Sequence, residues 1–305
     1  MKSIHHPTPL LETTTSNTKA TIWLKLENLQ PSGSFKLRGI GHKCAVFAQE
    51  GVQEFICASG GNAGIAVAYS GRKLQIPVNV IVPKTTSQKA IQAITDHGAS
   101  VRVHGESYQQ AHQKALELLH KENRYIHAYD HPLVWDGHAT LMDEVKKEGL
   151  RPDGIVLAVG GGGLLCGVAE GLKRNKWEDI PILAVETVGA HALAYSLEAN
   201  KLLSLEKISS IATTLGASQV AQKAFEVATS QAIESCVVTD KQAVRACLQF
   251  HQEQRSVVEP ACGAALSVVY EGHSFLEDKK NLLVIVCGGS GSSLEQLCKW
   301  EKELP

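Results

Sequence analysis

The segment "GIVLAVGGGGLLCGV" (154–168) joins an apolar, strand-like run to a helix-like run through four consecutive glycines, Gly160, Gly161, Gly162 and Gly163. Backbone N–H groups at a glycine-rich helix start converge on an anion, and the missing side chains let a phosphate approach closely. A merely tight turn rarely needs four glycines in succession. No Gly-Lys-Ser/Thr follows, so the segment is not a P-loop. We therefore expect a phosphate-binding corner here.

The same alternation of strand and helix extends along most of the chain. Apolar runs predict strands at 21–27, 55–59, 78–83, 100–103, 154–160, 181–186 and 282–289. Amphipathic runs predict helices at 36–50, 62–74, 86–97, 107–122, 136–148, 163–174, 240–252, 260–271 and 290–301. This pattern indicates an α/β protein whose mostly parallel sheets are flanked by helices. Because the middle block forms its own strand–helix series, we expect two open sheets, with 34–139 as a small domain and 1–33 with 140–305 as a large one.

Composition excludes several classes of partner. The chain has 30 basic and 31 acidic residues, so no strong field favours nucleic acid or an anionic membrane. No apolar run is long enough to span a membrane, and the start of the chain lacks the apolar region of a signal peptide. Eight cysteines without a C-x-x-C pair fit reduced thiols, so we expect a cytoplasmic protein.

Histidines raise the question of a metal site. The tightest cluster is His127, His131 and His138, in "HAYDHPLVWDGHAT". Pro132 and Gly137 are expected to break the helix that would align these side chains, and no cysteine or carboxylate stands at ligand spacing. We therefore interpret these histidines as ordinary polar residues.

Three further corners are rich in small residues: "SGSFK" (32–36), "SGGNAG" (59–64) and "VCGGSGSS" (286–293). In the second, Ser59 and Asn62 add a hydroxyl and an amide to backbone donors, which suits a carboxylate, although either residue could simply be a helix N-cap. In the first, Lys36 stands at a helix start, where electrostatics favours an acidic residue. It is either a solvated lysine beside an N-cap serine or an amine whose lowered pKa suits it to act as a nucleophile.

A phosphate corner, a carboxylate corner and a lysine at a helix start together suit pyridoxal phosphate, a phosphorylated cofactor that bonds to lysine and accepts amino acids. The chain resembles the fold-type II (tryptophan-synthase-β-like) pyridoxal phosphate enzymes. Within them it is most similar to the short animal-type L-serine dehydratase/L-threonine deaminase family. The motifs that carry this resemblance run in family order: "TPL" (8–10), "PSGSFKLRGIGH" (31–42), "SGGNAGIAVAY" (59–69), "WDGH" (135–138), "VGGGGLLCGV" (159–168), "VETVGAHA" (185–192), "VEPACGAAL" (258–266) and "VIVCGGS" (284–290).

The resemblance implies a role for each matching residue. Lys36 is the Schiff-base lysine, and the expected catalytic residues are Lys36 and Ser59. The cofactor is expected to contact Phe35, Lys36, Asn62, Gly160, Gly161, Gly162, Gly163, Leu164 and Cys287. The substrate carboxylate is expected to lie against Ser59, Gly60, Gly61, Asn62 and Ala63. A monovalent cation, potassium, is expected at Gly160, Glu186, Ala190, Leu215 and Ala217.

The resemblance also implies the reaction. It is β-elimination on L-serine or L-threonine, which yields pyruvate or 2-oxobutanoate and ammonia, by a homodimer with a small amino-acid substrate. Other possibilities are β-replacement or racemisation on the same fold, or a non-catalytic amino-acid-binding relative. Two departures bear on the reaction. Gly60 stands where the most active animal form has alanine, and Ala192 stands where the animal enzyme has a hydroxyl near the cation.

Overall fold

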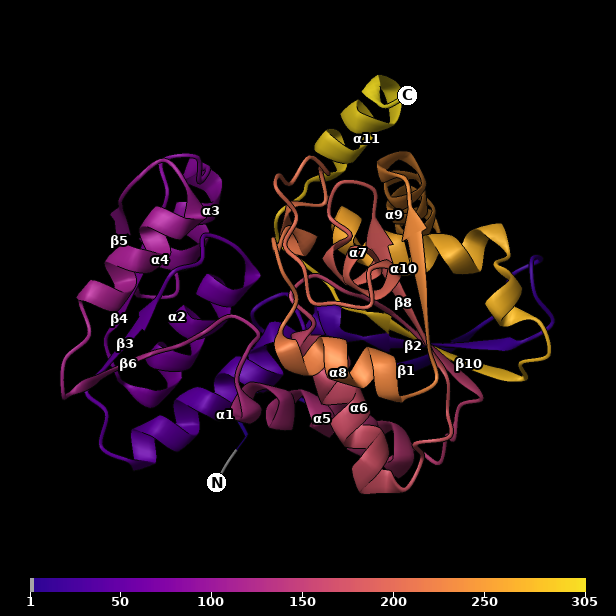
Figure 1. Ribbon diagram of the computed structural model, residues 1–305, viewed down its shortest axis with the longest axis horizontal. Coiled ribbons are helices and arrows are strands. Elements are labelled where there is room, and N and C mark those ends of the chain that lie inside the picture. Colours follow the sequence, from indigo (N-terminus) through magenta and orange to yellow (C-terminus); the bar gives the residue numbers. More distant parts are fainter. Residues whose placement is uncertain (1–2) are drawn as a thin grey trace. The chain divides into compact units, whose positions relative to one another are not determined.

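The computed structural model describes residues 3–305 and divides into two compact units (Figure 1). The smaller unit comprises the described residues up to His6 together with Gln30–His138, and the larger comprises Pro7–Leu29 and Ala139–Pro305. Residues 3–6 and 30–33 thus lie with the smaller unit, whereas the sequence pattern assigned them to the large domain.

The larger unit is built on a six-stranded sheet in the order β1-β2-β10-β7-β8-β9. Its strands are β1 (Leu10–Thr13), β2 (Thr21–Leu26), β7 (Gly154–Ala158), β8 (Ile182–Thr187), β9 (Ile233–Val238) and β10 (Asn281–Val286). All pairings are parallel except that of β1 with β2. The central strands β7 and β10 are apolar along nearly their whole length because helices cover both faces.

The helices of the larger unit follow these strands. They are α6 (Gly163–Asn175), α7 (Ala192–Glu198), α8 (Gln222–Ser230), α9 (Asp240–Gln254), α10 (Pro260–Glu271) and α11 (Leu294–Glu303). Figure 1 shows α6 and α8 on one side of the sheet and α9 and α10 on the other. Helix α5 (Pro132–Lys147) runs from the smaller unit into the larger.

The smaller unit contains a parallel sheet in the order β5-β4-β3-β6. Its strands are β3 (Glu54–Cys57), β4 (Val78–Val82), β5 (Ser100–Val103) and β6 (Asn123–Tyr125), and its helices are α1 (Lys36–Gln49), α2 (Asn62–Leu74), α3 (Gln88–Thr95) and α4 (Tyr108–Glu117). Alternate strand residues face opposite sides. One face packs with α1 and α2 into the larger apolar cluster, while Ile56 and Ile81 on the other face pack against Ala111 and Ala115 of α4.

The predicted class, two mostly parallel sheets flanked by helices, is confirmed. The sequence pattern missed β1, β6 and β9, and it missed the short helices α7 and α8. These elements carry a weak signal because β1 is a partly exposed edge strand and β6 has three residues. The expected helix break at Gly137 is wrong, because α5 continues through this residue. At Pro132 α5 begins, since proline is tolerated at the first turn of a helix. Gly137 lies inside α5, where a Cβ would be 2.4 Å from the carbonyl oxygen of Arg38.

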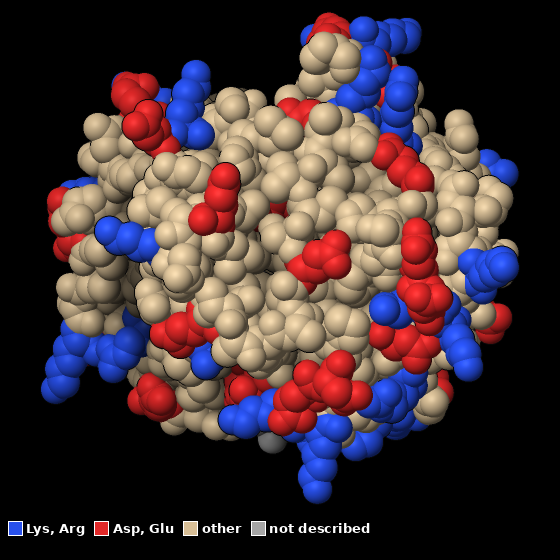
Figure 2. Space-filling view, turned by 45° about the vertical axis from the view of Figure 1, so that its right-hand side comes forward, with Lys and Arg blue, Asp and Glu red and all other residues tan. Residues whose placement is uncertain are grey.

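Among residues 3–305, no helix is both long enough and apolar enough to cross a membrane. On the face seen in Figure 2, acidic and basic side chains are interspersed rather than gathered by sign.

Candidate active site

Lys36 is the first residue of α1, and its side chain is partly buried within the smaller unit. Its Nζ donates a hydrogen bond to the carbonyl oxygen of Ala128 at 3.0 Å. The same amine lies 5.1 Å from the ring centroid of Phe35 and 6.0 Å from that of Tyr129. The lysine is therefore enclosed by two aromatic rings and a carbonyl group.

No serine caps the start of α1. The N-cap residue is Phe35, whose side chain makes no capping hydrogen bond. The hydroxyls of Ser32 and Ser34 are buried and have no hydrogen-bond partner within the described chain. The interpretation of Lys36 as a solvated lysine beside an N-cap serine is therefore wrong, and two buried hydroxyls remain for an external group.

His138, which sequence reasoning did not assign to the site, supports Phe35. The two ring centroids lie 4.9 Å apart, and His138 Nδ1 accepts the backbone N–H of Gly39 at 3.2 Å. Burial, together with nearby positive charge, lowers the pKa of His138 well below its usual value, so the ring is neutral. The signal for this residue was its place in the "WDGH" motif.

The start of α2 carries the residues expected to hold the substrate carboxylate. Its N-cap is Gly61, and no side chain caps this end of the helix. Asn62 is the first helical residue and is 8% exposed, and Ser59 Oγ accepts the backbone N–H of Gly61 at 3.4 Å. The alternative of an asparagine or serine N-cap is therefore wrong. An uncapped helix start fits a carboxylate ligand.

Gly60 lies against a side chain from a different loop. A Cβ on Gly60 would be 2.6 Å from Cγ2 and 2.9 Å from Oγ1 of Thr86. Thr86 thus occupies the space that a larger residue at position 60 would need.

The glycine run forms the start of α6 in the larger unit. Gly162 is the N-cap residue with φ +83°, and a Cβ on it would lie 2.3 Å from Cβ of Ala224. Gly160 approaches Leu215 so closely that a Cβ would be 3.0 Å from its Cα. The first turn of α6 has neither a side-chain cap nor an acidic residue. This arrangement fits a phosphate group, because the helix start remains uncapped and carries partial positive charge.

Glu186 is the next-to-last residue of β8 and is fully buried. Oε1 accepts the backbone N–H of Leu193 at 2.9 Å, and Oε2 accepts that of Ala194 at 2.8 Å. Burial raises the pKa of Glu186 to about 7, although these two hydrogen bonds lower it. The start of α7 therefore offsets part of the carboxylate charge, which sequence reasoning had left entirely to a cation. Ala192 is the first residue of α7 and is buried.

Cys287 directly follows β10 and is 5% exposed. A hydrogen bond with the thiol of Cys262, and burial, raise the pKa of Cys287 well above its usual value, so the thiol is neutral. Glu259, the N-cap residue of α10, is buried nearby and accepts hydrogen bonds from Thr214 Oγ1 at 2.7 Å and the backbone N–H of Gly291 at 3.4 Å. Sequence reasoning missed Glu259 and Thr214, although Glu259 belongs to the "VEPACGAAL" motif.

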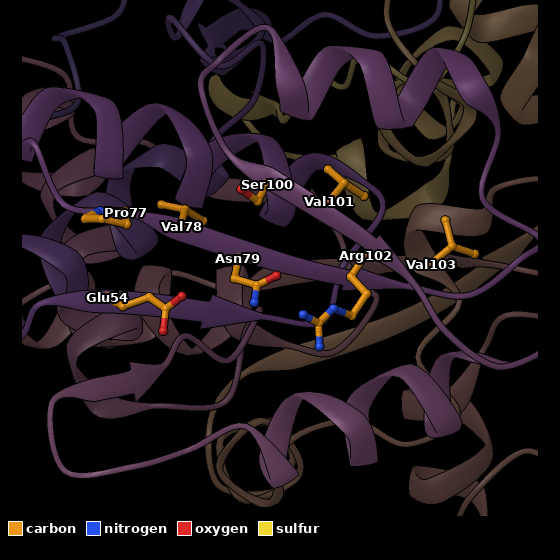
Figure 3. Close-up of a pocket in the computed structure, with 8 residues that line it drawn as sticks. All are labelled: Glu54, Pro77, Val78, Asn79, Ser100, Val101, Arg102 and Val103. Atoms are coloured by element: carbon orange, nitrogen blue, oxygen red, sulfur yellow. The ribbon is translucent and has the colours of Figure 1, made fainter.

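A separate hollow of about 540 Å³ lies on the sheet of the smaller unit (Figure 3). Figure 3 shows Glu54, Asn79 and Arg102 pointing to the same side. It is lined by the amino-terminal ends of β3 and β4 and by the whole length of the edge strand β5, whereas ligands of open α/β sheets gather at the carboxyl ends. No residue predicted for the active site lines this hollow.

The clustered histidines serve local structure. His127 Nδ1 accepts the backbone N–H of Asp130, and His131 Nδ1 accepts that of Leu133. Within residues 3–305, no group of three or more His, Cys, Asp or Glu side chains is arranged to hold a metal ion.

Comparison with known proteins decides the family. The family described as "Pyridoxal-phosphate dependent enzyme" matches residues 1–288. The chain belongs to this family. It is 44% identical to the L-serine dehydratase/L-threonine deaminase of Bos taurus, over 99% of this chain and 97% of that protein. The crystal structure of a fungal L-serine ammonia-lyase from Rhizomucor miehei superposes with a TM-score of 0.95, at 36% identity and full coverage of both chains.

The resemblance drawn from the motifs is thus confirmed. A maize serine racemase superposes with a TM-score of 0.87 at 24% identity, over 98% of this chain and 92% of that one. Because a racemase shares the fold, the fold alone does not separate elimination from racemisation. The family does imply pyridoxal phosphate, which the uncapped helix starts and the glycine run fit.

Proposed function

We propose that this chain is an ammonia-lyase that acts on L-serine and L-threonine, releasing ammonia and leaving pyruvate or 2-oxobutanoate. The water lost in the elimination is taken up again when the imine product hydrolyses. The observation that carries the proposal is Lys36, a partly buried lysine at the start of α1 whose amine is held by a carbonyl group and two rings. The similarity to a dehydratase and an ammonia-lyase over nearly the whole chain supports this reaction class.

In the smaller unit, Lys36 is the residue that attaches the cofactor and later takes the Cα proton as a general base. Phe35 packs on the cofactor ring, and Asn62 hydrogen-bonds its hydroxyl. The start of α2, from Ser59 to Ala63, holds the substrate carboxylate; its lack of a side-chain cap supports this role. Ser59 is the catalytic partner of Lys36 in this proposal.

In the larger unit, the phosphate is held by Gly160, Gly161, Gly162, Gly163 and Leu164. Cys287 faces the pyridine nitrogen. When bound, the cofactor supplies an electron sink for the electron pair left at Cα. A neutral thiol leaves that nitrogen largely unprotonated, which favours prompt loss of the β-hydroxyl over reactions that need a persistent carbanion.

We also propose a potassium site formed by the Glu186 carboxylate with the carbonyl groups of Gly160, Ala190, Leu215 and Ala217. The close approach of Gly160 to Leu215 supports a common site for these carbonyls. The raised pKa of Glu186 indicates that α7 compensates only part of its charge.

The finer expectations rest on the family resemblance. We propose a homodimer, which light scattering on the purified protein would test. We propose a cytoplasmic location, and the eight cysteines, all free in the structure, support a reducing compartment.

To test this proposal, L-serine and L-threonine are supplied separately and the products are measured. The proposal predicts that 2-oxo acid and ammonia form in equal amounts. Formation of D-serine without oxo acid would favour a racemase. Formation of a β-substituted amino acid from an added nucleophile, without oxo acid, would favour β-replacement. A colourless protein in which borohydride fixes no cofactor would favour a non-catalytic binder.

A further inference from the structure

The loop between β6 and α5 forms one side of the surroundings of Lys36. It supplies the Ala128 carbonyl that accepts the lysine hydrogen bond at 3.0 Å. It also supplies Tyr129, whose ring centroid lies 6.0 Å from Lys36 Nζ. The conformation of this loop therefore decides where the amine finds its acceptor.

His127 holds this loop in a turn. Its Nδ1 accepts the backbone N–H of Asp130 at 2.9 Å and that of Tyr129 at 3.4 Å, and its ring meets the Tyr129 ring edge-on at 4.7 Å between centroids. Accepting these bonds requires a lone pair on Nδ1, so the ring must be neutral with its proton on Nε2. A protonated ring would direct an N–H at two N–H donors and open the turn.

The surroundings of His127 keep the ring neutral. Burial lowers the pKa of His127 to about 4, and the charge of Lys43 is the next cause. Lys43 lies on α1, seven residues after Lys36, and is 2% exposed. Burial lowers the pKa of Lys43 to about 8, so its amine is charged below that pH.

The other titratable groups around His127 come from four places. They are Lys36 on α1, His112 on α4, Tyr125 on β6, and Tyr129, Asp130 and His131 in the loop itself. His112 and His131 also have lowered pKa values because of burial, so they add no charge near neutral pH. Lys43 and Lys36 are therefore the positive groups that oppose protonation of His127.

We propose that His127 is a positioning residue for Lys36, whose neutral ring holds residues 127–130 in the turn that presents the Ala128 carbonyl, and that the charge of Lys43 protects this state against acid. This inference rests on the proposed role of Lys36. Because the pKa of His127 is depressed in the folded protein, the turn is fully stable above the unfolded value of 6.5 and is lost as pH falls through about 4.

The first test replaces His127 with residues that separate its hydrogen bonds from its titration. In His127→Asn, the side-chain oxygen accepts from backbone N–H groups two and three residues ahead but does not titrate. The acid limb of kcat should therefore move to lower pH. In His127→Ala, kcat should fall about tenfold at all pH values with little change in KM, because a hydrogen-bonded position worth about 1.4 kcal/mol is lost.

The matched control is His120→Asn. His120 is an exposed histidine whose Nδ1 likewise accepts a backbone N–H, that of Glu122 at 3.3 Å. Its replacement should leave the pH profile as in the wild type. If kcat falls at the same acidic pH in the wild type and in His127→Asn, the proposal is overturned.

The second test reads the ring directly in cofactor-free protein with ¹⁵N-labelled histidine. The His127 signal, identified by its loss in His127→Asn, should show an unprotonated Nδ1 down to about pH 5. Lys43→Met should raise the titration of His127 by about one pH unit, and Lys43→Arg should not. Titration near the ordinary histidine value, unaffected by Lys43→Met, would overturn the proposal. A wrong role for Lys36 would be detected by a different observation, namely cofactor bonded to another lysine.

Discussion

The carboxylate of Glu186 lies at the amino end of α7, where its Oε1 accepts the backbone N–H of Leu193 at 2.9 Å. This contact stabilises a buried negative charge only in part, since burial still raises the pKa of Glu186 to about 7. A raised carboxyl pKa means that stability is fully present below the unfolded value of 4.5 and is lost as pH rises through about 7. A bound cation would favour the ionised carboxylate and so recover the stability that is lost at high pH.

Potassium should therefore raise the melting temperature more at about pH 8 than at about pH 5, compared with tetramethylammonium at equal concentration. Glu186→Gln should lose the difference between the two salts. Differential scanning calorimetry provides the measurement, with lithium as a second reference. Equal melting temperatures in every salt would remove the cation from this site.

The glycine run offers two substitutions with different expected effects. Gly162→Ala should destabilise even the cofactor-free protein by about 1–3 kcal/mol, because φ is positive and the Cβ meets Ala224. Gly161→Val should mainly weaken cofactor affinity, by about tenfold or more, since its side chain blocks the phosphate. Thermal unfolding without cofactor and dialysis with it separate the two effects. Full cofactor retention by Gly161→Val would mean that the phosphate binds elsewhere.

Gly60 and Thr86 should be energetically coupled. In Gly60→Ala, the new methyl group meets both branches of the Thr86 side chain, so stability and kcat should fall. Thr86→Ser removes the closer branch, Cγ2, and the double variant should recover about 1 kcal/mol of stability in a double-mutant cycle. Additive effects would show that the loop carrying Thr86 relaxes freely.

Cys287 should control the product ratio more than cofactor binding. Cys287→Ser keeps a neutral group and should retain pyridoxal phosphate and much of the elimination activity. Cys287→Asp should hold the pyridine nitrogen protonated, shift the absorbance of the bound cofactor and raise transamination or racemisation relative to oxo-acid release. An unchanged spectrum and product ratio in Cys287→Asp would place the thiol away from the ring.

Sequence reasoning predicted the sheets well where strands are buried on both sides. The runs at 154–160 and 282–289 correspond to β7 and β10, which are apolar because helices cover both faces. It failed at β6, where three residues leave no detectable periodicity, and at β9, where the strand is half-exposed. The start of α5 was missed because a proline inside a sequence usually indicates a helix break, whereas Pro132 occupies the first turn of α5.

The candidate site residues could be predicted because each lies in a short sequence motif. The residues that pack against them could not be predicted, because these contacts join positions that are distant in sequence. His138 packs on Phe35 from about a hundred residues away, and Thr214 bonds to Glu259 across a separation of 45 residues. The N-cap alternatives at Ser59 and Asn62 could be decided only by backbone geometry, since the same residues could have capped α2 themselves. The turn made by His127 gave no sequence signal beyond a histidine in a loop.

The central claim is that Lys36 carries the cofactor, and α1 contains a natural competitor. Lys43 is a second lysine on the same helix, nearly buried, with a pKa lowered to about 8. A lowered pKa is also what a reactive amine needs, so Lys43 is the sharpest alternative. Lys36→Ala and Lys36→Arg should both abolish oxo-acid release, because neither side chain can form the covalent bond.

The most direct measurement is borohydride reduction of the purified holoenzyme, followed by proteolysis and mass spectrometry of the lysine-containing peptides. The account predicts that the reduced cofactor is found on Lys36, and that Lys43→Met leaves this labelling in place. Label on Lys43 or on any other lysine, or a fully active Lys36→Ala enzyme, would contradict it.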